Sequence, residues 1–185
     1  GTIEYFKRQS IDLLFTMPMA PSTGFGGIDR NIGDVENYGI EFTLNYVPFS
    51  SKDFTWTIDL NGTSYENKIT KLPQDEMNSG YFKWREGESR FNFWGIEYAG
   101  VNPENGNDQY WMVVDKEDGS TERVKTEDYN AVSSDKHKKY LGDALPTLFG
   151  GLTNSFSYKG IDFSFMIYYS LGGKLYDGDY AQAMA

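Results

Sequence analysis

The sequence contains no cysteine and a single histidine, His137, among its 185 residues. Without cysteine there is no disulfide, no thiolate metal site and no cysteine nucleophile. One histidine excludes a zinc site built from several histidines, and a Ser-His-Asp triad would have to use His137. Basic residues are also few, with 17 Lys plus Arg against 27 Asp plus Glu and a formal charge of −10. Because binding to a phosphate backbone needs clustered positive charge, we expect no nucleic-acid partner.

Long apolar runs are absent too, since none reaches the 18 residues that a transmembrane helix needs. Aromatic residues make up 17% of the chain and glycine contributes 20 residues, while mean hydropathy is −0.57. This composition favours strands and turns over helices. It does not exclude a membrane, because the alternating strands of a transmembrane barrel average out as polar. No initiator Met and no signal peptide precede the first strand-like stretch, so we expect an internal piece of a longer protein.

Apolar and polar residues alternate with a period of two in four stretches. These stretches are residues 39–46, 53–63, 152–158 and 161–169. Such alternation predicts strands with one apolar and one polar face. Residues 2–15 form a fifth predicted strand with a weaker pattern. Its expected apolar face contains Ile3, Tyr5, Ile11, Leu13 and Phe15.

The connections between these strands differ in length. Residues 50–52 and Lys159-Gly160 form short turns, whereas residues 16–36 and 70–147 form long loops. Short turns at one end and long loops at the other are the layout of outer-membrane barrels. A sandwich that buries its apolar faces against a second sheet shows the same alternation. The loop asymmetry favours the barrel, and the alternative is a soluble or cell-surface β-sandwich module that binds carbohydrate.

The insert at residues 70–147 contains three of the four tryptophans, which predicts an ordered subdomain that packs on itself. Within it, the β-rich runs 109–115 and 120–124 flank Asp118-Gly119, a dipeptide typical of hairpin turns. Residues 102–106 predict a further turn.

Five stretches of the chain, taken in order, form a recognisable series. They are Tyr5–Phe15 with Pro21–Phe25, Asn31–Glu41, Tyr98–Gly106, Tyr140–Pro146 running into Gly150–Gly160, and Gly172–Gly178. This series resembles the SusC/RagA family of TonB-linked outer-membrane transporters, in the later part of the family's barrel. The resemblance covers nearly the whole chain, and five matches in order are far more specific than one.

The resemblance implies an all-β fold: about five strands of an antiparallel, 22-stranded transmembrane β-barrel, with a long extracellular loop subdomain. Residues 1–69 would supply barrel strands and one extracellular loop, residues 70–147 the loop subdomain, and residues 148–185 further barrel strands and the start of the next extracellular loop. It also implies a place in the bacterial outer membrane, in contact with its lipid, and import of oligosaccharides or peptides. The implied partners are a SusD-like surface lipoprotein and the TonB complex, reached through an N-terminal part that this sequence lacks.

Candidate site residues fall into two groups. Six aromatic residues are candidates for contact with substrate or with the lipoprotein lid, the alternative being that they form the core of the insert: Trp84, Phe91, Phe93, Trp94, Tyr110 and Trp111. Three acidic residues on polar strand faces are candidates for lining the lumen: Glu41, Asp59 and Asp162.

We expect no cofactor, no metal and no catalysis. Asp115, Glu117 and Asp118 offer oxygen ligands of the kind that Ca²⁺ takes, but their spacing is not that of an EF-hand loop. His137 lies among lysines, with no nucleophile or orienting partner marked in the sequence. The protein is therefore not expected to be an enzyme.

Overall fold

The structure is a computed structural model that describes residues 1–18, 22, 24 and 26–183. Pro21, Thr23 and Phe25 of the first resembling stretch lie outside the described residues, as do Met184 and Ala185. The described chain divides into two compact units. The first comprises Gly1–Met77, Trp84–Phe91 and Asp143–Ala185, and the second comprises Asn78–Lys83 and Asn92–Gly142. No described helix has both the length and the apolar character needed to cross a membrane.

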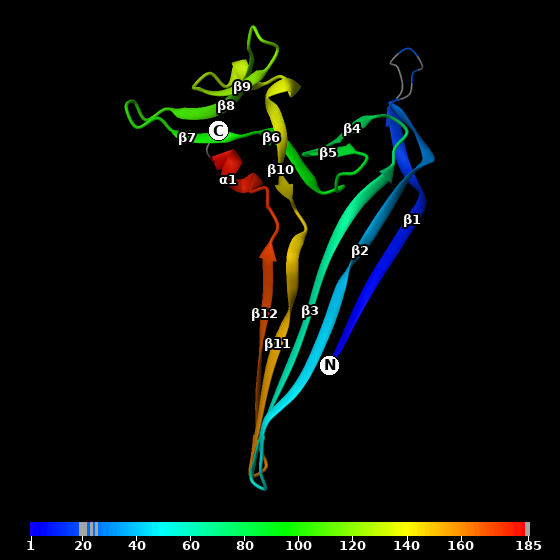
Figure 1. The fold of residues 1–185 in the computed structure, drawn as a ribbon, viewed down its shortest axis with the longest axis vertical. Helices are drawn as coiled ribbons and strands as arrows, with labels where there is room; N and C mark the ends of the chain where they lie inside the picture. Colours follow the sequence, from blue (N-terminus) through cyan, green and yellow to red (C-terminus); the bar gives the residue numbers. More distant parts are fainter. Residues whose placement is uncertain (19–21, 23, 25, 184–185) are drawn as a thin grey trace. The chain divides into compact units, whose positions relative to one another are not determined.

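The first unit is built on one antiparallel sheet of five long strands (Figure 1). The strands are β1 (Thr2–Pro18), β2 (Gly27–Ser50), β3 (Phe54–Lys71), β11 (Pro146–Tyr158) and β12 (Ile161–Gly172). They lie in the order β1-β2-β3-β11-β12, so that β3 pairs directly with β11 although the whole insert separates them in sequence. The five predicted strands are therefore confirmed as one sheet.

The strand register gathers the apolar side chains on one face. Trp56 of β3 lies opposite Phe49 of β2 and Phe156 of β11. The Phe156 ring lies within 6.4 Å, between ring centroids, of Phe54, Trp56, Phe163 and Phe165. The polar face carries rows such as Thr57, Ser155 and Ser164. Since the period-two pattern places alternate side chains on opposite faces, the sheet has the two unlike faces that the sequence predicts.

The apolar face remains open in the described structure. Exposed fractions are 52% for Phe49, 61% for Phe163 and 51% for Ile167. A β-sandwich would bury these side chains against a second sheet. In the described residues no second sheet covers this face.

Both predicted short turns are confirmed. Lys159 and Gly160 join β11 to β12 with φ of 48° and 86°, the pair of positive angles that a type I′ hairpin turn requires. Ser51 closes the turn between β2 and β3, where its backbone N–H donates to the Phe54 carbonyl at 2.8 Å. The two turns lie at the same end of the sheet (Figure 1).

Strand β2 is longer than the sequence pattern predicts. Residues 16–36 were expected to form a loop, but β1 extends to Pro18 and β2 begins at Gly27, so most of this prediction is wrong. The pairing of Ser10 with Val35 and of Met17 with Ile28 holds this part of β2 in the sheet. Residues 27–36 lack alternation, but strand pairing uses backbone groups, which every sequence supplies.

A β-bulge divides β1 into two parts. The register with β2 shifts between Ser10 and Leu13, and Asp12 adopts a φ of 54° while its backbone N–H donates to the Asp34 carboxylate at 3.0 Å. Ile3 and Tyr5 are exposed, whereas Leu13 packs against a buried cluster. The expectation that Leu13 shares a face with Ile3 is therefore wrong, because a bulge inserts residues and re-aims the strand.

The buried cluster lies at the loop end of the first unit. It consists of Val35, Ile69 and Leu72, against which Leu13, Met77 and Trp84 pack. Backbone hydrogen bonds tie Ile69 to the loop that follows β5: its N–H donates to the Glu88 carbonyl at 2.9 Å, and its carbonyl accepts from the Gly87 N–H at 2.8 Å. The loop is thereby fixed to the end of β3.

The remaining strands form two small sheets. One has the order β10-β6-β5-β4 and the other the order β7-β8-β9. Their bounds are β4 (Glu76–Ser79), β5 (Phe82–Arg85), β6 (Asn92–Ile96), β7 (Tyr98–Val101), β8 (Asp108–Asp115), β9 (Thr121–Thr126) and β10 (Lys138–Asp143). The predicted hairpin is confirmed as β8 and β9, with Gly119 at a φ of 81° in the turn. A single short helix, α1 (Gly178–Ala183), ends the described chain.

Candidate functional site

The pairing of β3 with β11 ends before either element does. The paired stretch runs from Phe54 opposite Tyr158 to Thr63 opposite Phe149, after which β3 continues to Lys71. Beyond Thr63 the strands β3 and β11 separate. The loop containing Gly87 and Ser89 lies beside the C-terminal end of β3. A fork in the sheet results, and a hollow of about 320 Å³ lies within it.

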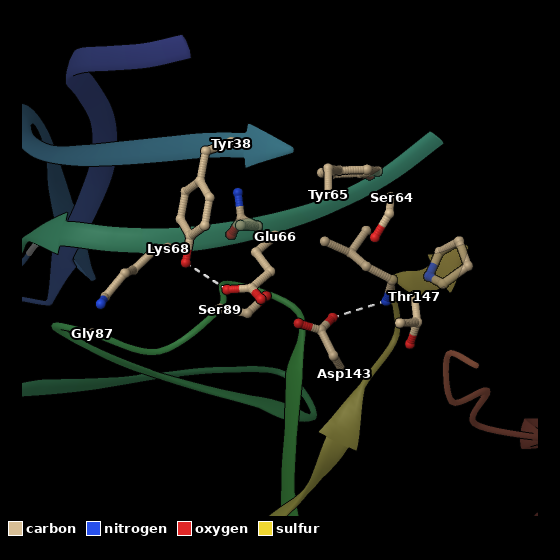
Figure 2. A pocket seen from close by; sticks show the side chains of 12 residues that line it. Tyr38, Ser64, Tyr65, Glu66, Lys68, Gly87, Ser89, Asp143 and Thr147 are labelled. Carbon is tan, nitrogen blue, oxygen red and sulfur yellow. Dashed lines mark hydrogen bonds between the residues drawn. The ribbon is translucent and has the colours of Figure 1, made fainter. Parts of the chain in front are cut away.

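We call this hollow the fork pocket. Figure 2 shows its lining, which β2, β3, the Gly87–Ser89 loop and the segment leading into β11 supply. The lining residues are Tyr38, Ser64, Tyr65, Glu66, Asn67, Lys68, Gly87, Ser89, Asp143, Leu145, Pro146 and Thr147. All of them belong to the first unit.

Two carboxylates dominate the electrostatics of the fork pocket. The Tyr38 hydroxyl donates to Oε2 of Glu66 at 2.5 Å, and the Leu145 backbone N–H donates to Oδ1 of Asp143 at 2.8 Å. In Figure 2, Glu66 reaches from β3 and Asp143 from the opposite side, and the two carboxylates face one another. Each hydrogen bond occupies one oxygen and leaves the other oxygen of the carboxylate able to accept from a bound molecule.

The walls of the fork pocket are held in place by side-chain hydrogen bonds. The Asn67 amide is buried, donates to Oδ1 of Asn37 at 2.7 Å and accepts from the Arg90 backbone N–H at 3.0 Å. The Tyr65 ring makes an edge contact with Phe149, with ring centroids 6.1 Å apart. These contacts fix the side chains that form the walls of the fork pocket.

The six aromatic candidates do not converge on one site. Trp84 packs on the buried cluster of the first unit and donates from Nε1 to the Arg90 carbonyl at 2.9 Å. Phe91 lies in the same unit with the Arg90 guanidinium 5.9 Å from its ring centroid. The other four candidates belong to the second unit.

Within the second unit the four aromatic candidates make separate contacts. Phe93 lies against Phe82, with ring centroids 4.8 Å apart, and Tyr110 makes edge contacts with Tyr98 and Tyr129. Trp111 lies under the Arg123 guanidinium at 5.1 Å. Each ring thus has packing partners from its own unit.

Trp94 belongs to a cluster with Lys83 and Asp135, which we call the Lys83 cluster. Lys83, whose side chain is only 3% exposed, lies 4.4 Å above the Trp94 ring and 2.5 Å from Oδ2 of Asp135. Trp94 donates from Nε1 to the other oxygen of Asp135 at 2.9 Å, and its ring makes an edge contact with Tyr140. The hydrogen bond from Lys83, with that from Trp94, holds the pKa of the Asp135 carboxyl below its ordinary value.

Two further carboxylates of the second unit are held in the charged form. Arg123 and Lys139 both pair with Glu97 and lower its pKa. Glu127 accepts side-chain hydrogen bonds from three asparagines of the turn between β7 and β8, and these bonds lower its pKa. The asparagines are Asn102, Asn105 and Asn107. Both carboxylates therefore fasten loop segments to their neighbours.

The three acidic lumen candidates all lie on the polar face of the five-stranded sheet. Glu41 of β2 lies opposite Glu4 of β1 and Thr63 of β3. Asp59 accepts a hydrogen bond from the Asn45 amide at 2.6 Å. Asp162 lines a shallow hollow of about 260 Å³ together with hydroxyl side chains from β3, β11 and β12. The candidates are thus spread over the face and not gathered into one site.

The acidic residues near the tip of the β8–β9 hairpin contact other residues of the second unit. Asp115 forms an ion pair with Lys136, and Asp118 accepts from the Ser120 backbone N–H at 2.9 Å. In the part of the chain that the structure describes, no three His, Asp or Glu side chains converge as metal ligands would. His137, in a 3₁₀ turn, accepts a hydrogen bond at Nδ1 from the Val113 backbone N–H at 3.1 Å.

The sequence analysis did not select the residues of the fork pocket. Tyr38 and Asp143 stand inside two of the resembling stretches, Asn31–Glu41 and Tyr140–Pro146, which was the one available signal. Glu66 lies among polar residues near the C-terminal end of β3, and no motif in the sequence singles it out. The three residues come together only because pairing between β3 and β11 stops at Thr63.

Comparison with known proteins identifies the chain's relatives. No protein-family model matches it. The TonB-dependent receptor SusC of Bacteroides thetaiotaomicron is 33% identical over 192 residues, which include 95% of this chain and 18% of the receptor. The TonB-dependent receptor P3 of Formosa agariphila is 30% identical over 94% of this chain and 19% of the receptor. The chain is therefore similar in sequence to a segment of TonB-dependent receptors, SusC among them.

Solved structures show the same fold. The RagAB peptide importer in its closed-closed state superposes on 92% of this chain with a TM-score of 0.77 and 23% sequence identity. Its open-open state gives a TM-score of 0.76. The five long strands therefore match part of the wall of a TonB-dependent barrel, as the sequence resemblance implies. The chain spans about a fifth of the length of these SusC/RagA-type relatives.

Proposed function

We propose that this chain is a wall and loop segment of an outer-membrane, TonB-dependent importer of oligosaccharides or peptides. The observation that carries the proposal is the two-faced sheet: its apolar face is open along β12, and its opposite face carries hydroxyl and carboxylate side chains. A barrel wall needs such a sheet, because one face meets lipid and the other meets a polar lumen. The chain transports and does not transform its substrate.

Two partners support import in this proposal. A SusD-like surface lipoprotein meets the loops of the insert that connects β3 to β11. The TonB complex acts through a part of the protein outside this chain. This segment shares the fold of the RagAB peptide importer. This likeness supports a lipoprotein partner for the present protein.

The proposal fixes which turns face the cell exterior. An epitope tag inserted at Gly119, in the turn between β8 and β9, should bind antibody on intact cells that express the full-length protein. The matched control is the same tag at Gly160, in the turn between β11 and β12, which should bind antibody only after the outer membrane is permeabilised. Labelling of both tags on intact cells, or recovery of the protein outside the outer-membrane fraction, would contradict the proposal.

Transport itself needs a second measurement. Cells that express the protein should accumulate a labelled oligosaccharide or peptide, and a protonophore should abolish this accumulation. A lipoprotein should co-purify with the protein from detergent extracts. Accumulation that persists after the proton-motive force is dissipated would exclude TonB-dependent import.

A further inference from the structure

The charged side chains that β3 contributes to the fork pocket project from the apolar face of the sheet. Strand β3 pairs without a register shift from Phe54 to Ile69, so Glu66 and Lys68 share the face of Trp56. Tyr38 lies opposite Glu66 and projects from the same face. This charged wall of the pocket therefore belongs to the face that the proposed function places in lipid, and not to the lumen.

The uncharged part of this face ends where the pocket begins. On β3 the face carries no charged side chain from Phe54 to Ser64. These ten residue steps, at roughly 3.3 Å each on a strand tilted by about 40°, cover about 25 Å of the membrane normal, which is the height of the apolar band of an outer-membrane barrel. The next row across the sheet consists of Lys7, Tyr38 and Glu66. The pocket therefore lies at the level of the lipid headgroups.

The lining has an acidic end and a basic end. In Figure 2 the Glu66 carboxylate lies between the Lys68 ammonium and the Asp143 carboxylate. Because two carboxylates that face one another repel, a cationic group between them would stabilise the site. Ca²⁺ takes roughly six to eight oxygen ligands, and in the described part of the chain no third acidic side chain joins these two. Since Lys68 would repel a bare cation, the lining suits a ligand that carries an ammonium group and an anionic group together.

A phosphoethanolamine headgroup carries these two groups a few bonds apart. Its ammonium has three N–H donors for the free carboxylate oxygens, and its phosphate accepts from Lys68. The pocket volume of about 320 Å³ lies near the lower end of the range for small-ligand sites, roughly 300–1,000 Å³, which suits one headgroup. On the same face, β2 continues from Tyr38 toward the short turns with Ile40 and Leu44, which are 49% and 46% exposed. Acyl chains attached to a headgroup in the pocket can lie along these side chains.

We propose that the fork pocket binds the phosphoethanolamine headgroup of a membrane lipid. The free oxygens of Glu66 and Asp143 accept hydrogen bonds from its ammonium, Lys68 pairs with its phosphate, and its acyl chains run along the apolar face. The bound lipid anchors the loop end of this wall at the membrane surface. This inference rests on the proposed importer function, because that function places the apolar face in lipid.

Native mass spectrometry of the full-length protein in detergent tests the inference by measuring the Kd of the first lipid bound. The probes are phosphatidylethanolamine, phosphatidylglycerol and phosphatidylcholine with identical acyl chains. Phosphatidylglycerol lacks the ammonium group, and the quaternary ammonium of phosphatidylcholine has no N–H donor. Soluble phosphoethanolamine serves as a competitor, and EDTA removes divalent cations.

Two variants remove one charge each from the acidic end of the pocket. Glu66→Gln and Asp143→Asn keep the shape of each side chain and an oxygen that accepts from Tyr38 or Leu145. The control is Glu117→Gln, at the exposed tip of the β8–β9 hairpin, which does not line the pocket. Circular dichroism confirms that each variant is folded.

We expect phosphatidylethanolamine to bind with a Kd about tenfold or more below that of the other two lipids. Loss of one charge-assisted hydrogen bond should raise this Kd about tenfold in each pocket variant, and Glu117→Gln and EDTA should leave it unchanged. Equal affinity for the three lipids, a wild-type Kd in either pocket variant, or loss of binding in EDTA would overturn the inference.

The competitor separates a lipid from a soluble ligand. Soluble phosphoethanolamine at the lipid's concentration should not displace the lipid, because it lacks the acyl chains. Displacement at that concentration would overturn the assignment to a membrane lipid. The antibody labelling at Gly119 and Gly160 decides the importer proposal separately, so failure of the pocket is distinguishable from failure of the function.

Discussion

The Lys83 cluster, formed by Lys83, Trp94 and Asp135, predicts where a mutation most reduces the stability of the second unit. The Lys83 ammonium is buried, lies over Trp94 and contacts Asp135, which in turn holds the Trp94 indole. Asp135 begins the 3₁₀ turn that leads into β10. Substituting Asp135→Ala removes a carboxylate from a buried ammonium and an acceptor from Trp94 at the same time.

The size of this effect follows from burial. Breaking a fully buried ion pair by removing one partner costs about 3–5 kcal/mol. Asp135 is 49% exposed, so water screens its side of the pair, and we expect a loss of about 2 kcal/mol. A loss of that size corresponds to a roughly thirtyfold larger population of the locally open state.

Hydrogen–deuterium exchange of the full-length protein measures this population. Amides of β10 and of the turn at 135–137 should exchange about thirtyfold faster in Asp135→Ala. The control is Asp115→Ala, which breaks the ion pair with Lys136 on the same turn. Both partners there are well exposed, so the cost should be at most about 1 kcal/mol. Equal acceleration by the two substitutions would refute the argument from burial.

Three further predictions concern the sheet and the loops. Gly150→Ala should reduce the yield of folded protein, because the added Cβ would collide with the Asn61 carbonyl oxygen. In the control Gly151→Ala the nearest atom to the added Cβ is 3.5 Å away, so this variant should fold normally. The heat-modified mobility of barrels on gels measures the folded fraction. Ile58→Lys should cost ~2–4 kcal/mol near the bilayer midplane and Asp59→Lys far less, and equal losses in urea titrations in lipid would show that the faces are misassigned. The pKa values of Asp135, Glu97 and Glu127 are lowered in the folded state, so the unfolded state binds more protons at low pH. The stability that these carboxylates give to the folded protein therefore persists from pH 7 to pH 5 and is lost as the pH falls below about 4. Tryptophan fluorescence should then show no transition above pH 5, and a transition near pH 6 would contradict the assignment.

The strands with clear alternation could be predicted from the sequence. The pattern around Trp56, Phe156 and Phe163 marks β3, β11 and β12 because each strand carries apolar side chains on one face and polar side chains on the other. Period-two alternation detects only a difference in polarity between the two faces of a strand. It therefore missed residues 27–36 of β2, whose pairing with β1 depends on backbone hydrogen bonds.

Other features could not be predicted because they depend on distant parts of the chain. The bulge at Asp12, which turns Leu13 toward the buried cluster, depends on the Asp34 carboxylate of the neighbouring strand. The fork pocket depends on the point at which β3 and β11 separate, and it joins Tyr38, Glu66 and Asp143 across more than a hundred positions of sequence. A local pattern contains no information on such long-range pairing.

Cysteine scanning along β12 tests the central claim, that this sheet is a barrel wall, most directly. The absence of native cysteine means that each introduced thiol is the only one this chain contributes. In outer membranes holding the full-length protein, cysteines at Phe163, Phe165 and Ile167 should react with a lipid-soluble maleimide and resist a charged one. Cysteines at Asp162, Ser164 and Met166 should show the opposite preference. Equal reactivity of neighbouring positions with the charged reagent would contradict the account.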